Sequence, residues 1–123
     1  MNAIRFTAWI VFAFLFSALI PRASLYAHHS IAGDHDTTKT LYVTGIIKQT
    51  ELENPHSLMR IDANGKEWIA ILPSPSRLNV LGLRTKLLAG VSVKVVGYPH
   101  RQQNEIYAQS LTIDGKTIEF FPL

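Results

Sequence analysis

The sequence predicts an all-β protein with one short helix, folded as a small OB-like Greek-key barrel and preceded by a signal-peptide helix. Three observations carry this prediction: an apolar run near the start, alternating apolar and polar residues in about five later segments, and a helix signal between the third and fourth of these segments. That order is typical of OB-type barrels, and a generic small meander or sandwich with a crossover helix is the alternative.

Residues 1–27 have the features of a signal peptide. A basic residue, Arg5, precedes an apolar run over residues 8–20 that only Ser17 interrupts, and Pro21 and Arg22 end it. The run is shorter than the roughly 20 residues that a membrane-spanning helix needs. We therefore expect cleavage after Ala27, a periplasmic or secreted mature protein, and no membrane contact after cleavage. An uncleaved N-terminal anchor is the alternative.

Composition excludes several classes of function. Cleavage after Ala27 would remove Arg5 and Arg22 from the twelve basic residues and none of the nine acidic ones, leaving a net charge of about +1. A mature chain without a basic field is poorly suited to phosphate backbones, so we expect no nucleic-acid partner. The absence of cysteine excludes disulfides, thiolate metal sites and cysteine nucleophiles.

The remaining chain divides into an extended N-terminal segment, residues 28–39, and an OB-like barrel domain, residues 40–123. In the first strand, Gly45 suggests a bulge or a sharp bend. A loop at Asn54-Pro55-His56 follows, because proline cannot donate to a ladder. Asn64-Gly65 then predicts a hairpin between two alternating runs.

The second half begins with a short helix, with Ser74 as N-cap, Pro75 at its first position and Gly82 as terminator. Strands are expected over residues 91–98 and 105–114. In the second of these, alternation places Tyr107, Gln109, Leu111 and Ile113 on one face. A tight turn at Asp114-Gly115 leads into a final strand over residues 116–121.

Five histidines provide the candidate chemistry. His28 and His29 would begin the mature chain, His35 follows in the same segment, and His56 and His100 lie in two loops. In an OB barrel these two loops flank the same ligand-binding face. If the N-terminal segment crosses that face, several imidazoles meet there.

Such a site favours a transition metal. The free amine and the ring of His28 would chelate a metal together, and a nitrogen-rich site without sulfur suits Cu(II), with Zn(II) and Ni(II) as alternatives. We predict His28, His29 and His56 as ligands, with His35, Asp36 and His100 as weaker candidates. The competing interpretations are a terminal histidine pair that binds metal without function, a structural turn at His56 and a solvated surface histidine at His100.

The sequence contains no G-x-S-x-G elbow, P-loop or H-E-x-x-H motif, so we predict a non-enzymatic, exported binding protein. The alternative is a metal-free OB-like module that binds a protein, a peptide, a saccharide or another small ligand in the periplasm. Its support is the aromatic set Trp68, Tyr42, Tyr98 and Tyr107. A redox enzyme with copper on the N-terminal histidine is a third, less favoured hypothesis.

Ala27-His28-His29-Ser30 and Asn54-Pro55-His56, together with Gly97-Tyr98-Pro99 and Asp114-Gly115, resemble an uncharacterised family of small exported proteins of Gram-negative bacteria. Its members typically begin A-H-H-S-F and carry N-P-H after the first strand. The resemblance implies export and a single small β domain, but no activity. This chain departs from the pattern at Ile31, Leu52 and Leu83, where the family usually has aromatic residues. These departures weaken the case for an aromatic ligand platform.

Overall fold

The computed structural model describes residues 31–121. It contains two short helices, α1 (Ile31–Asp34) and α2 (Pro75–Val80). Its strands are β1 (Leu41–Glu51), β2 (Ser57–Ala63), β3 (Lys66–Leu72), β4 (Ser92–Pro99), β5 (Glu105–Ile113) and β6 (Lys116–Glu119). The predicted signal peptide and the residues His28 and His29 lie outside the described range. No helix within residues 31–121 is long and apolar enough to cross a membrane.

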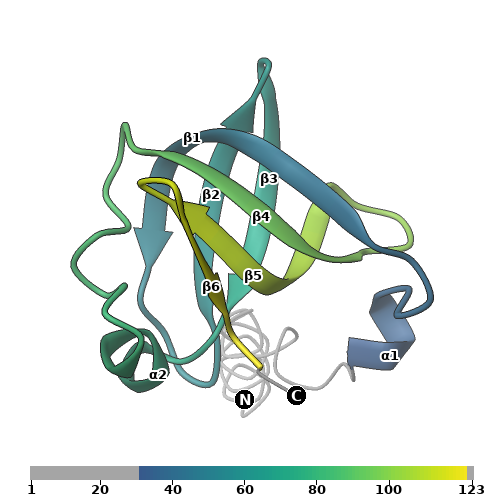
Figure 1. The fold of residues 1–123 in the computed structure, drawn as a ribbon. Coiled ribbons are helices and arrows are strands. Elements are labelled where there is room, and N and C mark those ends of the chain that lie inside the picture. The colour runs from purple at the N-terminus through teal and green to yellow at the C-terminus, as the bar shows by residue number, and fades with distance from the viewer. Residues whose placement is uncertain (1–30, 122–123) are drawn as a thin grey trace, which may run out of the picture.

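The strands form one sheet that closes into a barrel (Figure 1). Its order is β3-β2-β1-β4-β5-β6, and a parallel pairing of Ile69–Ile71 with Glu105–Tyr107 joins β3 to β5. Five strands therefore close the barrel, with α2 between β3 and β4 and with β6 added to β5. This arrangement confirms the predicted OB-type Greek-key barrel and excludes the open meander.

The core fills the inside of this barrel with aliphatic side chains. Strand alternation works as predicted on β2 and β3, where Met59 and Ile61 on one strand and Ala70 and Leu72 on the other are fully buried. Leu78 of α2 and Leu83 just after it cover one end of the barrel, and Phe120 is buried with them. Each fully buried side chain of this size contributes about 1.5–3 kcal/mol relative to an exposed one.

Local turn and cap signals also behave as predicted. Asn64 and Gly65 both adopt positive φ in the β2–β3 turn, and the Gly65 N–H donates to Oδ1 of Asp62. Ser74 caps α2 by accepting a hydrogen bond from the Arg77 N–H (3.3 Å), and Pro75 is the first helical residue. Gly82 takes a positive φ just beyond the helix.

Two strand bulges lie at positions that the sequence did not indicate. The bulge in β1 lies at Lys48 rather than at Gly45, because Ile47 pairs with Ile61 and Gln49 with Arg60. A second bulge lies at Gln109 of β5, because Ser110 pairs with Val96 and Ala108 with Gly97. This extra residue reverses the alternation of β5, so Leu111 and Ile113 face the core together with Ile106 and Ala108 instead of with Tyr107.

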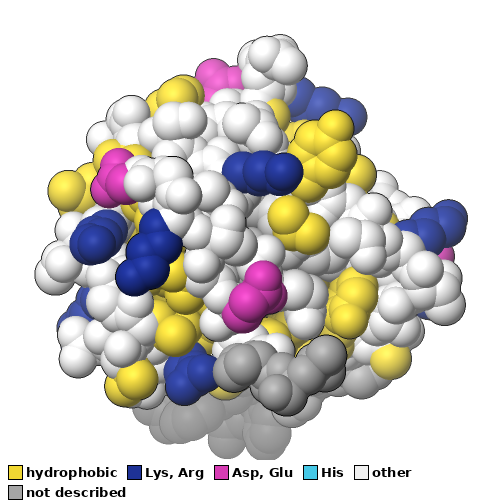
Figure 2. Space-filling view, viewed as in Figure 1, with side chains coloured by type: hydrophobic (Ala, Val, Ile, Leu, Met, Phe, Trp, Pro, Cys, Tyr) yellow, Lys and Arg dark blue, Asp and Glu magenta, His cyan; other side chains and the backbone are white. Residues whose placement is uncertain are grey.

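The N-terminal segment is also not extended throughout. Residues 31–34 form the single helical turn α1, and the His35 N–H donates to the Ile31 carbonyl oxygen (2.9 Å). At the other end of the chain, β6 stops at Glu119 and not at residue 121. Figure 2 shows basic, acidic and hydrophobic side chains interspersed over the face that it displays.

Candidate functional site: a histidine and tyrosine cluster at the mouth of the barrel

The N-terminal segment is fastened to the loop between β4 and β5. His35 forms an isolated antiparallel bridge with His100. On either side of this bridge, the Asp36 N–H donates to the Pro99 carbonyl oxygen and the Arg101 N–H donates to that of Asp34, both at 2.9 Å. The segment that follows His28 and His29 therefore lies against the barrel, as the metal hypothesis requires.

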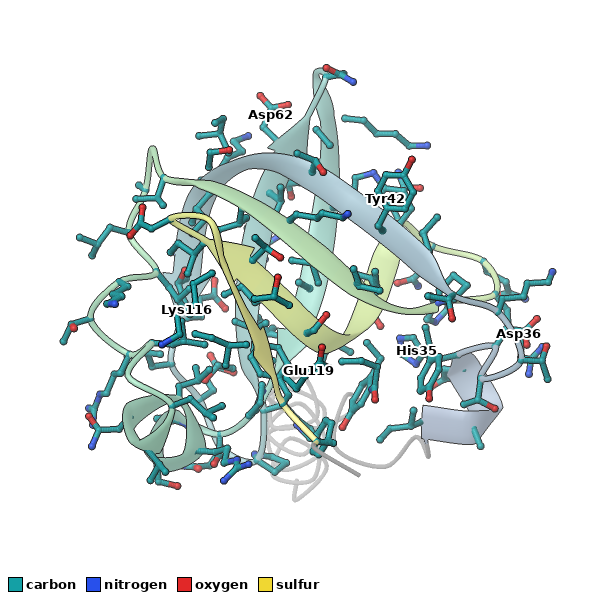
Figure 3. The ribbon with its side chains drawn as sticks, viewed as in Figure 1. His35, Asp36, Tyr42, Asp62, Lys116 and Glu119 are labelled. Atoms are coloured by element: carbon teal, nitrogen blue, oxygen red, sulfur yellow. The ribbon has the colours of Figure 1, made fainter. Side chains whose placement is uncertain are left out.

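His35 is buried against the first residue of β5 (Figure 3). Its side chain is 5% exposed, and its Nε2 lies 3.0 Å from Oε1 of Glu105, whose side chain is 6% exposed. The contact at Nε2 is close but is not a well-formed hydrogen bond. The other ring nitrogen, Nδ1, has no hydrogen-bond partner in residues 31–121. Buried polar groups are normally satisfied, so this ring is a candidate for binding something.

Tyr107 is the centre of the aromatic cluster. It lies two residues after Glu105, on the outer face of β5. Its ring is met edge-on by His35 (centroids 5.9 Å apart) and by His56 (5.8 Å), and it stacks on Phe121 (6.4 Å). Burial raises the pKa of the Tyr107 phenol, so the phenol stays neutral at physiological pH.

Three of the predicted histidines thus gather here from three segments. His100 joins through its ring contact with His35 (5.2 Å). His56 comes from the β1–β2 loop, directly after the cis Asn54–Pro55 peptide bond, and its Nδ1 is buried without a hydrogen-bond partner in the described chain. These contacts place the β1–β2 loop, the β4–β5 loop and the N-terminal segment at one face of the barrel.

Two of the three weaker candidates, His100 and Asp36, have structural roles. His100 Nδ1 accepts the N–H groups of Gln102 and Gln103 at 3.0 and 3.1 Å, which places the proton of the neutral ring on Nε2. A ring held in this way presents no lone pair outward for a metal. The Asp36 carboxylate accepts hydrogen bonds from the Thr38 N–H and hydroxyl, and these hold its pKa below its usual range.

The described residues do not form a complete metal site. Within residues 31–121, no group of three or more His, Asp or Glu side chains is placed to hold a metal ion. Additional ligands would have to come from outside this range.

Two site residues were missed by sequence reasoning. Glu105 received no role, and Tyr107 was named only as one of several aromatic residues. Both face outward from β5. They lie next to β3 because the barrel closes by parallel pairing of Ile69 with Glu105 and of Ile71 with Tyr107. The alternation of residues 105–107 was a usable signal, but only after the closure was known.

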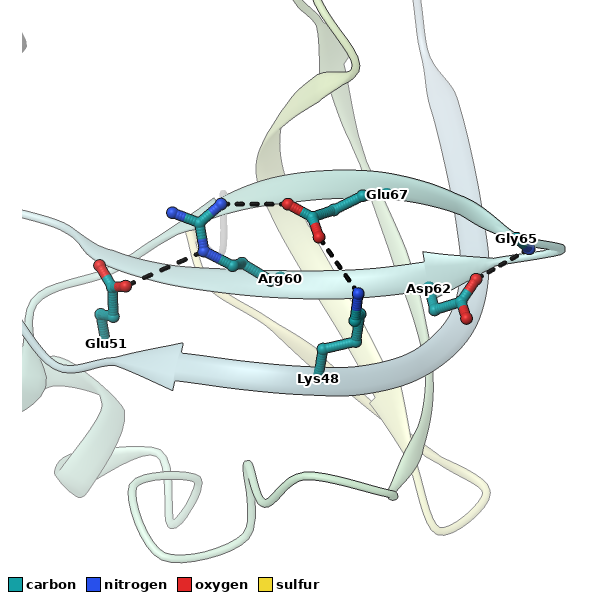
Figure 4. Close-up of polar contacts among 6 residues, drawn as sticks. All are labelled: Lys48, Glu51, Arg60, Asp62, Gly65 and Glu67. Atoms are coloured by element: carbon teal, nitrogen blue, oxygen red, sulfur yellow. Dashed lines mark hydrogen bonds and ion pairs between the residues drawn. The ribbon is translucent and has the colours of Figure 1, made fainter.

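The outer face of β1, β2 and β3 carries a charge-balanced network of two cations and two carboxylates (Figure 4). Glu67 lies 3.1 Å from Arg60 and 3.3 Å from Lys48, and Glu51 lies 3.9 Å from Arg60. The hydrogen bonds from Lys48 and Arg60 hold the Glu67 pKa below its usual range. The four charges thus balance one another on this face.

The model of one known protein family matches most of this chain. The chain belongs to DUF6152, a family of unknown function. The family model matches residues 18–108, which include both His28-His29 and Asn54-Pro55-His56. No match was found among curated proteins.

Solved structures show the same fold at low sequence identity. The Stn1–Ten1 complex of S. pombe matches with a TM-score of 0.50 and 16% identity, over 60% of this chain and 57% of that one. The ZRD-deleted mutant of TiaS in complex with agmatine also matches with a TM-score of 0.50 and 16% identity, over 69% of this chain and 27% of that one. The chain thus spans little more than half of one neighbour and about a quarter of the other. These likenesses establish the OB-type fold alone.

Proposed function

We propose that this protein is an exported, non-enzymatic binding protein that holds a divalent transition metal, with Cu(II) favoured, at the mouth of its barrel. The observation that carries the proposal is the backbone bridge between His35 and His100. It fastens the described part of the N-terminal segment beside Tyr107, whose ring also meets His56.

The proposed ligands are the amine and ring of His28, the ring of His29 and the ring of His56. Nitrogen ligands without sulfur suit Cu(II), and Zn(II) or Ni(II) would find acceptable donors in the same set. His56 supports this assignment because its buried Nδ1 has no hydrogen-bond partner within residues 31–121. His35 is held beside Glu105, an arrangement in which a carboxylate orients an imidazole that binds metal through its other nitrogen. We leave His100 and Asp36 out of the set because their acceptor atoms are already used.

Titration of the purified mature protein with Cu(II) tests this proposal. A variant with His28→Ala, His29→Ala and His56→Ala should bind at least tenfold more weakly than wild type, by analogy with loss of metal-site partners. An Asn79→Ala variant, at an exposed position of α2, is the control and should bind like wild type. Equal affinity of the triple variant and wild type would contradict the proposed site.

The second candidate is a metal-free module that binds a protein, peptide or saccharide partner. An apolar strip on the outer face of β2 and β3 supports it, between the β1–β2 loop and the β4–β5 loop. The strip consists of half-buried Leu58, Ile69 and Ile71. One structural neighbour, Stn1–Ten1, is itself a complex of two proteins. Capture of a partner that is insensitive to chelator, with no change in melting temperature on metal addition, would favour this candidate over the metal.

A further inference from the structure

A second surface lies at the opposite side of the molecule from α1, around α2. The chain from Trp68 to Asn104 contains no acidic residue and five basic ones, which are Arg77, Arg84, Lys86, Lys94 and Arg101. Three of the five fall in residues 75–90, which comprise α2 and the segment that leads to β4. We call residues 75–90 the α2 lobe (Figure 1).

The α2 lobe packs on the barrel through a regular set of leucines. Leu78, Leu83 and Leu87 are buried, and the Leu83 and Arg84 N–H groups both donate to the Leu78 carbonyl oxygen. Of the residues between these anchors, Leu81 also packs against the core and the others are exposed. Arg84 and Lys86 are exposed, and their side chains have no ion-pair or hydrogen-bond partner in residues 31–121.

Two exposed aliphatic side chains belong to the same segment as the cations. Val80 is 75% exposed and Leu88 is 61% exposed, and both belong to the small set of large hydrophobic residues exposed in the described chain. Figure 2 shows several Lys and Arg side chains on the left half of its face, with hydrophobic side chains and an acidic one among them, and Figure 3 shows that Lys116 of β6 lies in the same area. Single exposed aliphatic side chains are common on protein surfaces, but these two occur in a segment that also carries the exposed cations Arg84 and Lys86 and no acidic residue.

We propose that the outer surface of the α2 lobe docks on an anionic phospholipid bilayer. Cations attract the headgroups, and aliphatic side chains between them gain by entering the boundary of the acyl region. The same residues do not suit nucleic acid, because residues 75–90 contain no aromatic side chain on which a base could stack. A polyanionic glycan would use the cations but would gain nothing from Val80 and Leu88.

This docking goes beyond the proposed metal site and revises the expectation of no membrane contact after cleavage. The sequence did not show that Val80 and Leu88 are exposed while Leu78, Leu83 and Leu87 are buried. Since each basic residue near an anionic bilayer raises affinity about fivefold, Arg84 and Lys86 together supply about 25-fold. That attraction should fall steeply as salt is added.

Vesicle sedimentation with the full exported protein tests the proposal. Vesicles of phosphatidylcholine with about 30% phosphatidylglycerol are compared with vesicles of phosphatidylcholine alone, which report binding through any other part of the chain. Lys86→Gln should weaken binding to the anionic vesicles about fivefold, and Arg84→Gln/Lys86→Gln about 25-fold. Lys66→Gln, at the far β2–β3 hairpin, removes the same charge and should leave binding unchanged.

Val80→Asp/Leu88→Asp separates a bilayer from a polyanion. Both sites are exposed, so the variant should keep its melting temperature, while its binding to anionic vesicles should fall at least tenfold. The proposal is overturned if wild type does not bind the anionic vesicles more tightly than the neutral ones. It is also overturned if Lys66→Gln weakens binding as much as Lys86→Gln, or if the Val80/Leu88 variant binds like wild type.

Discussion

Gly97 sets how closely β4 approaches β5, and Gly97→Ala tests the packing directly beneath the histidine cluster. A Cβ at this position would lie 2.8 Å from the carbonyl carbon of Tyr107 and 3.0 Å from the Cα of Ala108, and closer still to the Tyr107 carbonyl oxygen. Non-bonded heavy atoms normally pack about 3.5–4.0 Å apart, so the strands would have to separate by about 1 Å or more. All three neighbours are backbone atoms, so no side chain can rotate to relieve the clash.

The expected cost follows from these contacts. Overpacking costs about 1–3 kcal/mol, and weakening one or two ladder hydrogen bonds adds about 1 kcal/mol for each. We expect Gly97→Ala to lower the free energy of unfolding by about 2–4 kcal/mol, which corresponds to a fall in Tm of at least about 10 °C for a domain of this size.

Thermal melting followed by circular dichroism measures this change. Ser92→Ala, at an exposed position of the same strand, is the control and should change stability by less than about 0.5 kcal/mol. A Gly97→Ala variant that melts within about 2 °C of wild type would show that β4 and β5 are not as close as described.

Three further predictions follow from individual contacts. Burial raises the Tyr107 pKa, so the stabilisation from its neutral form is fully present below the ordinary tyrosine pKa of about 10 and is lost as pH rises through the higher folded value. Alkaline absorbance titration should show one tyrosine that ionises late and that is absent from Tyr107→Phe. Identical titration curves for the variant and wild type would refute this. Ser74→Ala removes the acceptor for the Arg77 N–H and should cost about 1 kcal/mol in chemical denaturation, so an unchanged midpoint would contradict the cap. Leu83→Ala should cost about 2–5 kcal/mol, whereas the exposed Leu88→Ala should cost under about 0.5 kcal/mol, and similar losses for the two would disprove the burial pattern of the α2 lobe.

The parts of the fold that sequence predicted well are those set by local chemistry. Asn64-Gly65 fixes a turn because few residues adopt positive φ at low cost, and Ser74-Pro75 starts a helix because the cap and the ring act within one turn. Alternation on β2 and β3 predicted the buried side chains because both strands are regular along their whole length.

The irregular positions could not be predicted in the same way. The extra residues at Lys48 and Gln109 belong to the bending of a closed barrel, which depends on partner strands far away in the sequence. Gly45 suggested a bulge, but its actual role is a close approach, since a Cβ there would clash with the Asp62 backbone.

The candidate site was predicted in outline only. Topology correctly placed the β1–β2 and β4–β5 loops at one face, and the His35–His100 bridge confirms that the N-terminal segment reaches that face. Sequence could not show that Glu105 would meet His35, because their contact depends on how the N-terminal segment packs against the outside of the barrel. It also could not show that the His100 ring would be used by its own loop. Whether His28 and His29 bind metal stays a prediction.

Paramagnetic broadening in the NMR spectrum tests the central claim most directly, because bound Cu(II) broadens the signals of nearby nuclei. One equivalent of Cu(II) added to the mature protein should broaden the ring signals of His35, His56 and Tyr107, and should leave the Gly115 amide, in the β5–β6 turn, sharp. If only His28 and His29 are broadened, the metal binds the chain terminus without the barrel, and the proposed site at its mouth is wrong.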